Sequence, residues 1–233
     1  MPVPMKARKS MQSYKASRKV TPMMRVNRLV RRSIPAAIGR GLNRRGVASK
    51  ESGFVDLAYA SYPCNTTGSI TLIATIAQGA SVNQRVGKKV NLKSLQIRGV
   101  AINDTAATVN DCAVIIVYDR RPTGSLPAIT DVLDTANAAS FNNDANSGRF
   151  KIIKRMDFVL TGNSTTPGTG NEAMNLDCFI PLNGLPAVFK AAGTGAIGDI
   201  EEGALYCTTV GTNGAGNADA NAGMGFRTRF IDN

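Results

Sequence analysis

Basic side chains dominate the first 50 residues of this 233-residue chain, and their chemistry is that of a phosphate-binding polycation. Residues 1–50 contain 14 Lys and Arg and no Asp or Glu. Residues 51–233 contain 14 basic and 16 acidic residues, so that part is close to neutral. A polycation joined to a near-neutral body predicts sequence-independent contact with nucleic-acid phosphates, driven by counterion release. The predicted contact residues of this segment are Lys6, Arg8, Lys9, Lys15, Arg18, Lys19, Arg25, Arg28, Arg31, Arg32, Arg40, Arg44, Arg45 and Lys50.

Three other interpretations of residues 1–50 stay open, namely a solvated tail, an anchor to an anionic membrane and a mitochondrial presequence. Prolines and glycines interrupt any long helix there, which weighs against the amphipathic helix of a presequence. The pairs Arg31-Arg32 and Arg44-Arg45 also fit a nuclear import signal, although basic pairs are a weak motif. We therefore expect a basic, mostly irregular arm over residues 1–50 and one folded domain over residues 51–233.

The sequence offers little to a catalytic mechanism. It contains no His, which excludes Ser-His-Asp and Cys-His catalysis and zinc sites with His ligands. The Cys residues are far apart and form no CxxC pair, so we expect buried structural thiols rather than disulfides or a zinc site. They are Cys64, Cys112, Cys178 and Cys207. We expect a protein that is not an enzyme and that carries no cofactor.

Three groups of carboxylates could bind a divalent cation. They are Asp131 with Asp134, Asp199 with Glu201 and Glu202, and Asp119 beside Arg120. Hard oxygen ligands suit Ca²⁺, particularly where two subunits pool them at a contact. The interpretation that we favour is simpler, namely that these are acids of solvated loops.

Two segments near the middle of the sequence predict long strands. Residues 88–102 alternate between apolar and polar, with breaks in phase near Ser94 and Gly99 that predict bulges or a strong bend. Residues 112–118, CAVIIVY, form an unbroken apolar run that is short for a helix and typical of a strand buried on both faces. These two strands form the centre of the predicted body.

The rest of the body predicts more strands and almost no helix. The first extended segment, residues 54–64, would place Val55, Leu57 and Tyr59 on one face. A short helix fits residues 126–139, through Ile129, Val132 and Leu133. The other extended segments are 69–77, 149–160, 173–182, 204–210 and 224–231.

Eight or nine strands joined by loops longer than simple hairpins favour a sandwich with crossed connections. The predicted fold is all-β, a single eight-stranded jelly roll, which is an antiparallel β-sandwich. The longest apolar runs fall short of the roughly 20 residues that a membrane span requires, so we expect a soluble protein with no membrane partner.

Basic residues of the body are secondary candidates for nucleic-acid contact. Lys88, Lys89 and Lys93, with Arg98, could line a surface that faces nucleic acid. The alternative is a charged strand edge that deters aggregation. Near the end of the sequence, Arg227 and Arg229 alternate with apolar residues and could either face nucleic acid or pair across a subunit contact.

Several segments, in order, resemble the capsid proteins of small circular Rep-encoding single-stranded DNA viruses (CRESS-DNA viruses), especially geminivirus-like lineages. The matching pieces are the basic arm, GKKV at 87–90 leading into LKSLQI at 92–97, VYDRRPTG at 117–124, RFKIIK at 149–154 and RTRFID at 227–232. Each piece alone is a weak motif, and the resemblance depends on their order and spacing.

This resemblance implies a viral coat protein, found in the virion and, during assembly, in the host nucleus. It implies a jelly-roll subunit that self-assembles as a homo-oligomer into a small icosahedral shell, T=1 with about 60 copies. The arm would then package a single-stranded DNA genome. Alternatives are the capsid protein of a small RNA or satellite virus and a non-viral nucleic-acid-binding β-sandwich oligomer. A further alternative is an enzyme or lectin with the arm as a targeting segment.

Overall fold

The computed structural model describes residues 52–103, 109–162, 172–191, 193–215 and 220–232. The chain divides into two compact units, Met1–Ser49 and Lys50–Asn233, and the fold described here is that of the second. Its strands are β1 (Ser52–Cys64), β2 (Ser69–Leu72), β3 (Lys89–Ile102), β4 (Val109–Asp119), β5 (Phe150–Thr161), β6 (Ala173–Asn175), β7 (Cys178–Phe189), β8 (Ile200–Glu202), β9 (Ala204–Gly211) and β10 (Ala220–Asp232). Its helices are the single turn α3 (Ile129–Val132) and the 3₁₀ turns η1 (Asp144–Asn146) and η2 (Ile197–Asp199).

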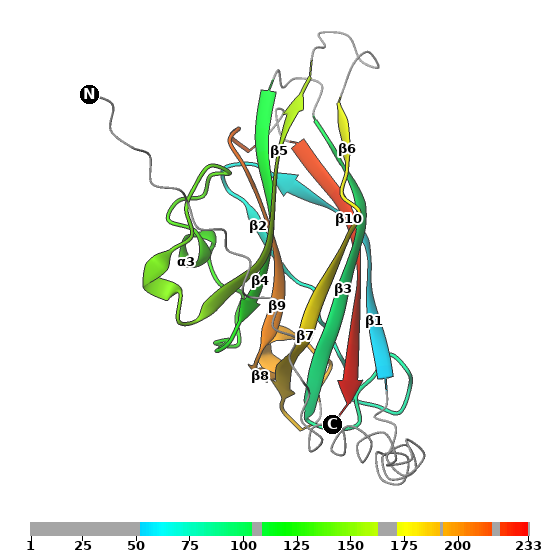
Figure 1. The fold of residues 1–233 in the computed structure, drawn as a ribbon. Coiled ribbons are helices and arrows are strands. Elements are labelled where there is room, and N and C mark those ends of the chain that lie inside the picture. The colour runs from blue at the N-terminus through cyan, green and yellow to red at the C-terminus, as the bar shows by residue number, and fades with distance from the viewer. Residues whose placement is uncertain (1–51, 104–108, 163–171, 192, 216–219, 233) are drawn as a thin grey trace, which may run out of the picture. The chain divides into compact units, whose positions relative to one another are not determined.

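The strands form two antiparallel sheets packed face to face (Figure 1). Sheet A has the order β1-β10-β3-β7-β8, with β6 paired to β3, and sheet B has the order β2-β9-β4-β5. If β6 to β8 are taken together, the chain crosses between the sheets at every step except β4 to β5. This topology is a jelly roll, as predicted. The described residues contain ten strands rather than eight, because β6 and β8 add two three-residue strands to sheet A.

The space between the sheets is filled by apolar side chains that alternate along the strands. On β10, Met224, Phe226 and Phe230 point inward and are buried, while Arg227 and Arg229 point outward and are exposed, as predicted. The inward residues of β3 and β4 complete the same core. They include Leu92, Leu95, Ile97, Cys112, Val114 and Ile116.

Strand β4 is buried on both faces, as its unbroken apolar run predicted. One face packs into the core between the sheets, and the other lies under residues 120–149, which connect β4 to β5. We call residues 120–149 the cover. Val132 and Leu133 of the cover have buried side chains. The helix that was predicted for this region is one turn long. The cover therefore completes a second apolar layer on the side of sheet B that faces away from sheet A.

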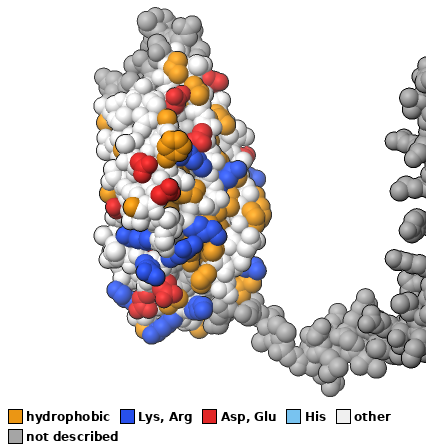
Figure 2. All heavy atoms as spheres, turned by 60° about the vertical axis from the view of Figure 1, so that its left-hand side comes forward, with side chains coloured by type: hydrophobic (Ala, Val, Ile, Leu, Met, Phe, Trp, Pro, Cys, Tyr) orange, Lys and Arg blue, Asp and Glu red, His pale blue; other side chains and the backbone are white. Residues whose placement is uncertain are grey.

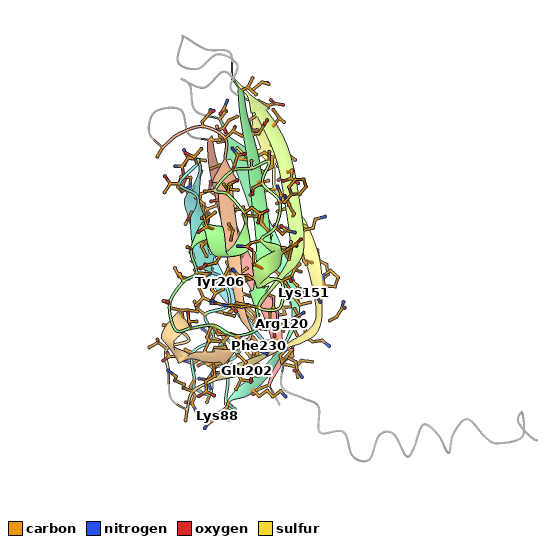
Figure 3. All side chains as sticks on the ribbon, turned by 90° about the vertical axis from the view of Figure 1, so that its left-hand side faces the viewer. Lys88, Arg120, Lys151, Glu202, Tyr206 and Phe230 are labelled. Atoms are coloured by element: carbon orange, nitrogen blue, oxygen red, sulfur yellow. The ribbon has the colours of Figure 1, made fainter. Side chains whose placement is uncertain are left out.

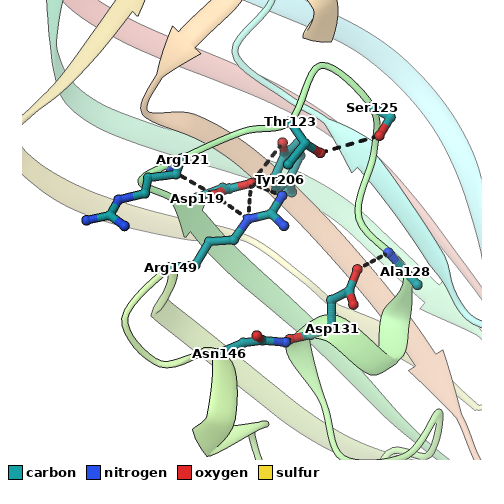
Figure 4. Close-up of polar contacts among 9 residues, drawn as sticks. All are labelled: Asp119, Arg121, Thr123, Ser125, Ala128, Asp131, Asn146, Arg149 and Tyr206. Atoms are coloured by element: carbon teal, nitrogen blue, oxygen red, sulfur yellow. Dashed lines mark hydrogen bonds and ion pairs between the residues drawn. The ribbon is translucent and has the colours of Figure 1, made fainter.

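A buried ion pair fastens the end of the cover to the sheet (Figure 4). Asp119, at the end of β4, is fully buried and accepts hydrogen bonds from Arg149 Nε at 3.1 Å and Nη2 at 2.9 Å. The Arg121 backbone N–H donates to the same carboxylate at 2.9 Å, and the Tyr206 hydroxyl lies 3.5 Å from it. The hydrogen bonds that Arg149 donates to Asp119 raise the pKa of Arg149, and burial raises the pKa of Tyr206. The expectation of a solvated Asp119 is therefore wrong.

Three other predictions about the strands were wrong. Strand β3 has a bulge beside Ser94, as predicted, but its pairing with β10 passes Gly99 without a shift. Gly99 therefore takes the inward position, and Val100 and Ile102 stay 38% and 46% exposed on the outer side. Residues 69–77 were predicted to be one extended segment, but only Ser69–Leu72 pairs as a strand. The predicted strand 173–182 is split into β6 and the longer β7.

Candidate nucleic-acid interface

Sheet A has an outer face, turned away from sheet B, that is rich in basic side chains. Five exposed cations lie there on two neighbouring strands, and we call this set the basic face. It consists of Lys89, Lys93 and Arg98 on β3 and Arg227 and Arg229 on β10. On the outer face of β1, β10 and β3, the described charged side chains are these five cations and the carboxylate of Asp56.

The bulge in β3 helps to build this face. The register with β7 shifts between Leu92 and Ser94, so Lys93 is the extra residue. Leu92 and Leu95 both point into the core and are fully buried. Because the bulge fits two residues between them, Lys93 and Ser94 both fall on the outer side. The break in phase that was visible in the sequence thus adds one more cation to the basic face.

Pairing between strands sets the positions of the arginines. Arg227 stands opposite Asp56 on β1 and Gln96 on β3, while Arg98 stands opposite Gly225. Gly225 is two residues from Arg227 on β10, so Arg98 and Arg227 are diagonal neighbours, roughly 7–8 Å apart at their backbones. Two residues beyond Arg227, Arg229 extends the row in the other direction.

The five cations differ in how they are held. Arg227 forms a two-pronged ion pair with Asp56, with N···O distances of 2.7 Å and 2.6 Å, and its guanidinium lies 4.9 Å from the centre of the Phe54 ring. The hydrogen bond from Arg227 lowers the pKa of Asp56, and the same bond raises the pKa of Arg227. Arg98 and Arg229 form no ion pair with any residue that the structure describes. Their charges are therefore available to an anionic partner.

A groove of about 520 Å³ opens on the same face where β1 is bulged. The register between β1 and β10 shifts between Leu57 and Ala60, so Ala58 and Tyr59 together face the single residue Gly225. The bulge turns Tyr59 outward, and its side chain is 67% exposed. The prediction that Tyr59 shares a face with Val55 and Leu57 was therefore wrong.

Glycines of β10 make room for the tyrosine ring. A Cβ added at Gly223 would overlap the Tyr59 hydroxyl, so the ring lies over that residue. At Gly225 a Cβ would keep an ordinary distance of 3.5 Å from the Tyr59 backbone nitrogen, so this residue is part of the open floor of the groove. We call this feature the Tyr59 groove. It is lined by Asp56, Leu57, Ala58, Tyr59, Gln96, Arg98, Gly225, Phe226 and Arg227.

The residues predicted for nucleic-acid contact are distributed unevenly in the structure. The fourteen of the arm, Lys6 to Lys50, lie outside the described residues. Lys88 is exposed in the loop before β3, at one end of the sandwich (Figure 3), and Lys89 and Lys93 belong to the basic face. The alternative of a charged strand edge is wrong for Lys89 and Lys93, because β3 lies between β10 and β7 inside sheet A.

Sequence reasoning missed two features of this side of the molecule. It did not bring Arg227 and Arg229 next to the basic residues of β3, because strand order in a sheet is not visible in a single sequence. It also placed Tyr59 with the core, since the bulge has no signature beyond the pair Ala58 and Ala60 around it. The strict alternation of residues 224–231 was the available signal that two arginines share an exposed face.

A second group of basic side chains lies on the other side of the body (Figure 2). Lys151 and Lys154 are exposed on β5, at the edge of sheet B. The cover contributes Arg120 and Arg121, which are both exposed, and Figure 2 shows both signs of charge on this surface. The charge of the surface in Figure 2 is therefore mixed, in contrast with the five cations and one carboxylate on the described outer face of β1, β10 and β3.

Two of the remaining acidic candidates accept hydrogen bonds from nearby backbone N–H groups. Asp131 Oδ2 accepts from the Ala128 N–H at 2.8 Å, and Asp199 Oδ2 accepts from the Thr194 N–H at 2.8 Å. Within the described part of the chain, no three His, Cys, Asp or Glu side chains are grouped as a metal site would require. Binding of Ca²⁺ where two subunits meet stays a prediction.

The four thiols are free, and three of them are buried, as predicted; Cys178 is half-buried. The neighbouring Cys112 and burial together raise the pKa of Cys64, and burial raises the pKa of Cys207 to about 12. The thiols of Cys64 and Cys207 are thus neutral and unreactive at physiological pH. Among the described helices, none is long and apolar enough to cross a membrane.

Comparisons with known proteins identify the family of the chain. The sequence profile of the geminivirus coat protein/nuclear export factor BR1 family matches residues 3–230. The chain is 33% identical over 139 residues to the capsid protein of Satellite tobacco necrosis virus 1, which covers 57% of this chain and 67% of that protein. It is 30% identical over 161 residues to the capsid protein of Miscanthus streak virus (isolate 91), covering 60% and 62% respectively.

Other similarities cover a shorter segment or have lower sequence identity. The coat protein of Maize white line mosaic Satellite virus is 33% identical over 93 residues, 38% of this chain and 43% of that protein. The chain thus spans roughly half to two thirds of the length of these curated relatives. Among solved structures, infectious bursal disease virus, Gx strain, has a TM-score of 0.32 at 11% identity, covering 78% of this chain and 32% of that one. Desmodium yellow mottle tymovirus has a TM-score of 0.29 at 11% identity, covering 80% and 91%. At these scores no residue correspondence follows.

Proposed function

The chain belongs to the geminivirus coat protein family, and from this premise we propose that it encloses a single-stranded DNA genome in a small icosahedral shell, with the basic face turned toward the genome. Its curated relatives are coat and capsid proteins, so it is a component of a virion rather than a member of a family of enzymes. The proposal adds the size of the shell, T=1 with about 60 copies, the assembly of that shell in the host nucleus, and the surface that meets the nucleic acid.

We choose the surface that faces the nucleic acid from one observation, which is the charge on the exposed side of sheet A. On the outer face of β1, β10 and β3, five described cations accompany a single carboxylate, and that carboxylate is already paired with Arg227. A surface of one sign attracts phosphate and releases counterions, whereas the mixed surface over the cover does so much less.

The arm and the basic face would both bind the packaged nucleic acid. The arm supplies 14 positive charges with no acidic residue, which suits contact with phosphates without reading of bases. The basic face supplies charges at fixed positions on a folded sheet. The arm thus gives most of the affinity, and the face gives the nucleic acid a defined path along the body.

The test begins with purified full-length protein, examined by negative-stain microscopy and by its absorbance at 260 and 280 nm before and after nuclease and high salt. Because the chain has no Trp and five Tyr, enclosed nucleic acid would dominate these readings. Uniform spherical particles with nuclease-protected absorbance are expected, and sequencing of the protected nucleic acid identifies it as DNA or RNA. Monomers or small rings that are free of nucleic acid at every salt concentration would refute the proposal.

Matched variants then test the surface. Arg98→Glu with Arg229→Glu reverses two unpaired charges of the basic face and should reduce protected nucleic acid severalfold. Arg121→Glu with Lys154→Glu makes the same change in charge outside the basic face and should leave packaging unchanged. Equal losses in both pairs would show that net charge alone matters, and the basic face would lose its assigned role.

Deletion of residues 1–50 should abolish packaging, and normal packaging without them would refute the role of the arm.

A further inference from the structure

We propose that the Tyr59 groove holds one unpaired base of a single-stranded nucleic acid, so that the folded body itself favours single strands over duplex. This inference rests on the proposed function, because it names the ligand of the same surface. It goes beyond that function because charge contacts to phosphates do not distinguish a single strand from a duplex of similar charge.

The first argument is the position of the aromatic ring. Tyr59 is 67% exposed although it lies in the middle of a 13-residue strand, and a bulge in β1 aims it outward. The ring lies over Gly223, which has no side chain that could displace it. A flat exposed ring that is held in place on a basic surface suits stacking of a base, and stacking tolerates every base because each has a π-face.

The second argument is the arrangement of charge around the ring. Arg98 and Arg227 both line the groove, so a base stacked on Tyr59 would have its phosphates within reach of these guanidinium groups. Arg227 is fixed by its ion pair with Asp56, while Arg98 has no ion-pair partner among the described residues. Arg229 continues the row of charge beyond the groove. An aromatic ring beside a row of cations is the pattern that binds single strands without reading sequence.

The third argument is size. The groove volume of about 520 Å³ is within the range of sites for small ligands, roughly 300–1,000 Å³. Gly225 leaves its floor open, and Gln96 provides an amide at the side that could bond to the edge of any base. A duplex keeps its bases stacked and paired, so it cannot place one in the groove without the cost of unpairing. Single strands have no such cost.

The experiment measures binding of full-length protein to a 20-nucleotide dT strand, to the same length of rU and to a 20-base-pair duplex, all at one salt concentration. Tyr59→Leu should weaken binding of the dT strand roughly tenfold, which is the typical loss of one stacked base, and should leave duplex binding unchanged. Tyr59→Phe keeps the ring and should bind like the original protein. Phe141→Leu removes an 82%-exposed aromatic from the cover and should change nothing.

Gly225→Val is a second variant that keeps the tyrosine. Its Cβ fits without a clash, while its methyl groups fill the floor of the groove, so it should weaken binding of dT as Tyr59→Leu does. Circular dichroism and particle assembly verify that each variant is folded. A parallel loss on rU identifies the unpaired base shared by DNA and RNA as the ligand, and a loss limited to dT restricts the ligand to DNA.

Photo-crosslinking gives direct evidence of contact. A dT strand that carries 5-iodouracil should crosslink to the tryptic peptide 51–85, at Tyr59. If the variants leave discrimination between single strand and duplex unchanged, or if the crosslinks fall elsewhere, the groove is not the base site, although the proposed coat function stands. If full-length protein binds neither single strand nor duplex, the proposed function itself fails.

Discussion

The outer faces of the two sheets differ in how far the chain itself covers them. On sheet B the chain covers its own outer face with residues 120–149, burying Val132 and Leu133 and fastening the cover with a buried ion pair. On sheet A the outer face stays open, with five cations, an exposed tyrosine and a groove. The difference shows which surface the fold completes by itself and which it leaves for a partner.

The two ion pairs illustrate the same contrast. Asp119 is fully buried, and its partner Arg149 is 25% exposed, so their bond holds two parts of the chain together. Asp56 and Arg227 are each 45% exposed, so their bond mainly fixes the direction of a guanidinium on the surface. A buried pair that loses one partner leaves an uncompensated charge, whereas an exposed pair is replaced by water.

The largest expected effect comes from breaking the buried pair. Asp119→Ala leaves Arg149 and the Arg121 N–H without their acceptor, and the free energy of unfolding should fall by about 3 kcal/mol. This is the lower end of the usual range, because Arg149 keeps some contact with water. Denaturant unfolding of the unassembled protein measures it. The matched change Asp56→Asn on sheet A should leave the midpoint almost unchanged, and equal losses would contradict the distinction between the two faces.

A smaller effect is expected where the cover meets β5. The Arg155 guanidinium donates to the backbone carbonyls of Ala138 and Ser140. Arg155→Ala should therefore loosen the cover and lower the free energy of unfolding by about 2 kcal/mol, through the loss of two charge-assisted hydrogen bonds. Limited trypsin digestion should then cut faster after Arg149. Arg98→Ala, which removes an exposed arginine of the open face, is the control and should digest like the original protein.

The smallest effect concerns the core that both faces share. Tyr118 of sheet B donates a 2.6 Å hydrogen bond to the carbonyl of Pro186 in sheet A, and burial raises its pKa to about 12 from 10.0. Because the folded-state pKa is the higher one, this contribution to stability is intact below pH 10 and is lost as pH rises through about 12.

Tyr118→Phe should cost about 1 kcal/mol at neutral pH through the lost hydrogen bond. The variant should also lose less stability than the original protein between pH 10 and 12, and denaturant unfolding at a series of alkaline pH values measures the difference. An identical alkaline loss in both proteins would show that other groups control the titration.

Much of the fold could be predicted from the sequence, because a core shared by two sheets imposes alternation on every strand. The apolar run 112–118 predicted burial on both faces, and the alternation of 224–231 predicted two outward arginines. Alternation could not predict the exposure of Val100 and Ile102. Gly99 occupies an inward-facing position, but a glycine has no apolar side chain that would mark this position in the sequence pattern. It also gave no sign that Asp119 would be buried, since the burial depends on Arg149, 30 residues away.

The candidate site was harder to predict than the fold. Lys89 and Lys93 were recognised from their charge, but the basic face also needs Arg227 and Arg229, which only strand pairing brings beside β3. The Tyr59 groove depends on a bulge whose cause is local pairing with β10, and no residue type in β1 marks it. The composition thus predicted nucleic acid as the ligand, whereas the position of the basic face depends on the strand order of sheet A.

The place of β10 in sheet A also sets an order of events when the subunit is made. This strand follows every other described strand in the sequence, yet it lies between β1 and β3, and its Asn221 bonds to Ser61, 160 residues earlier. During synthesis β1 and β3 therefore leave the ribosome without their shared neighbour, and such distant pairing is slow to form. Arg227 and Arg229 arrive with that last strand. The surface that we assign to the genome is thus complete only after β10 has been translated. Synthesis of the subunit therefore precedes its binding of the genome.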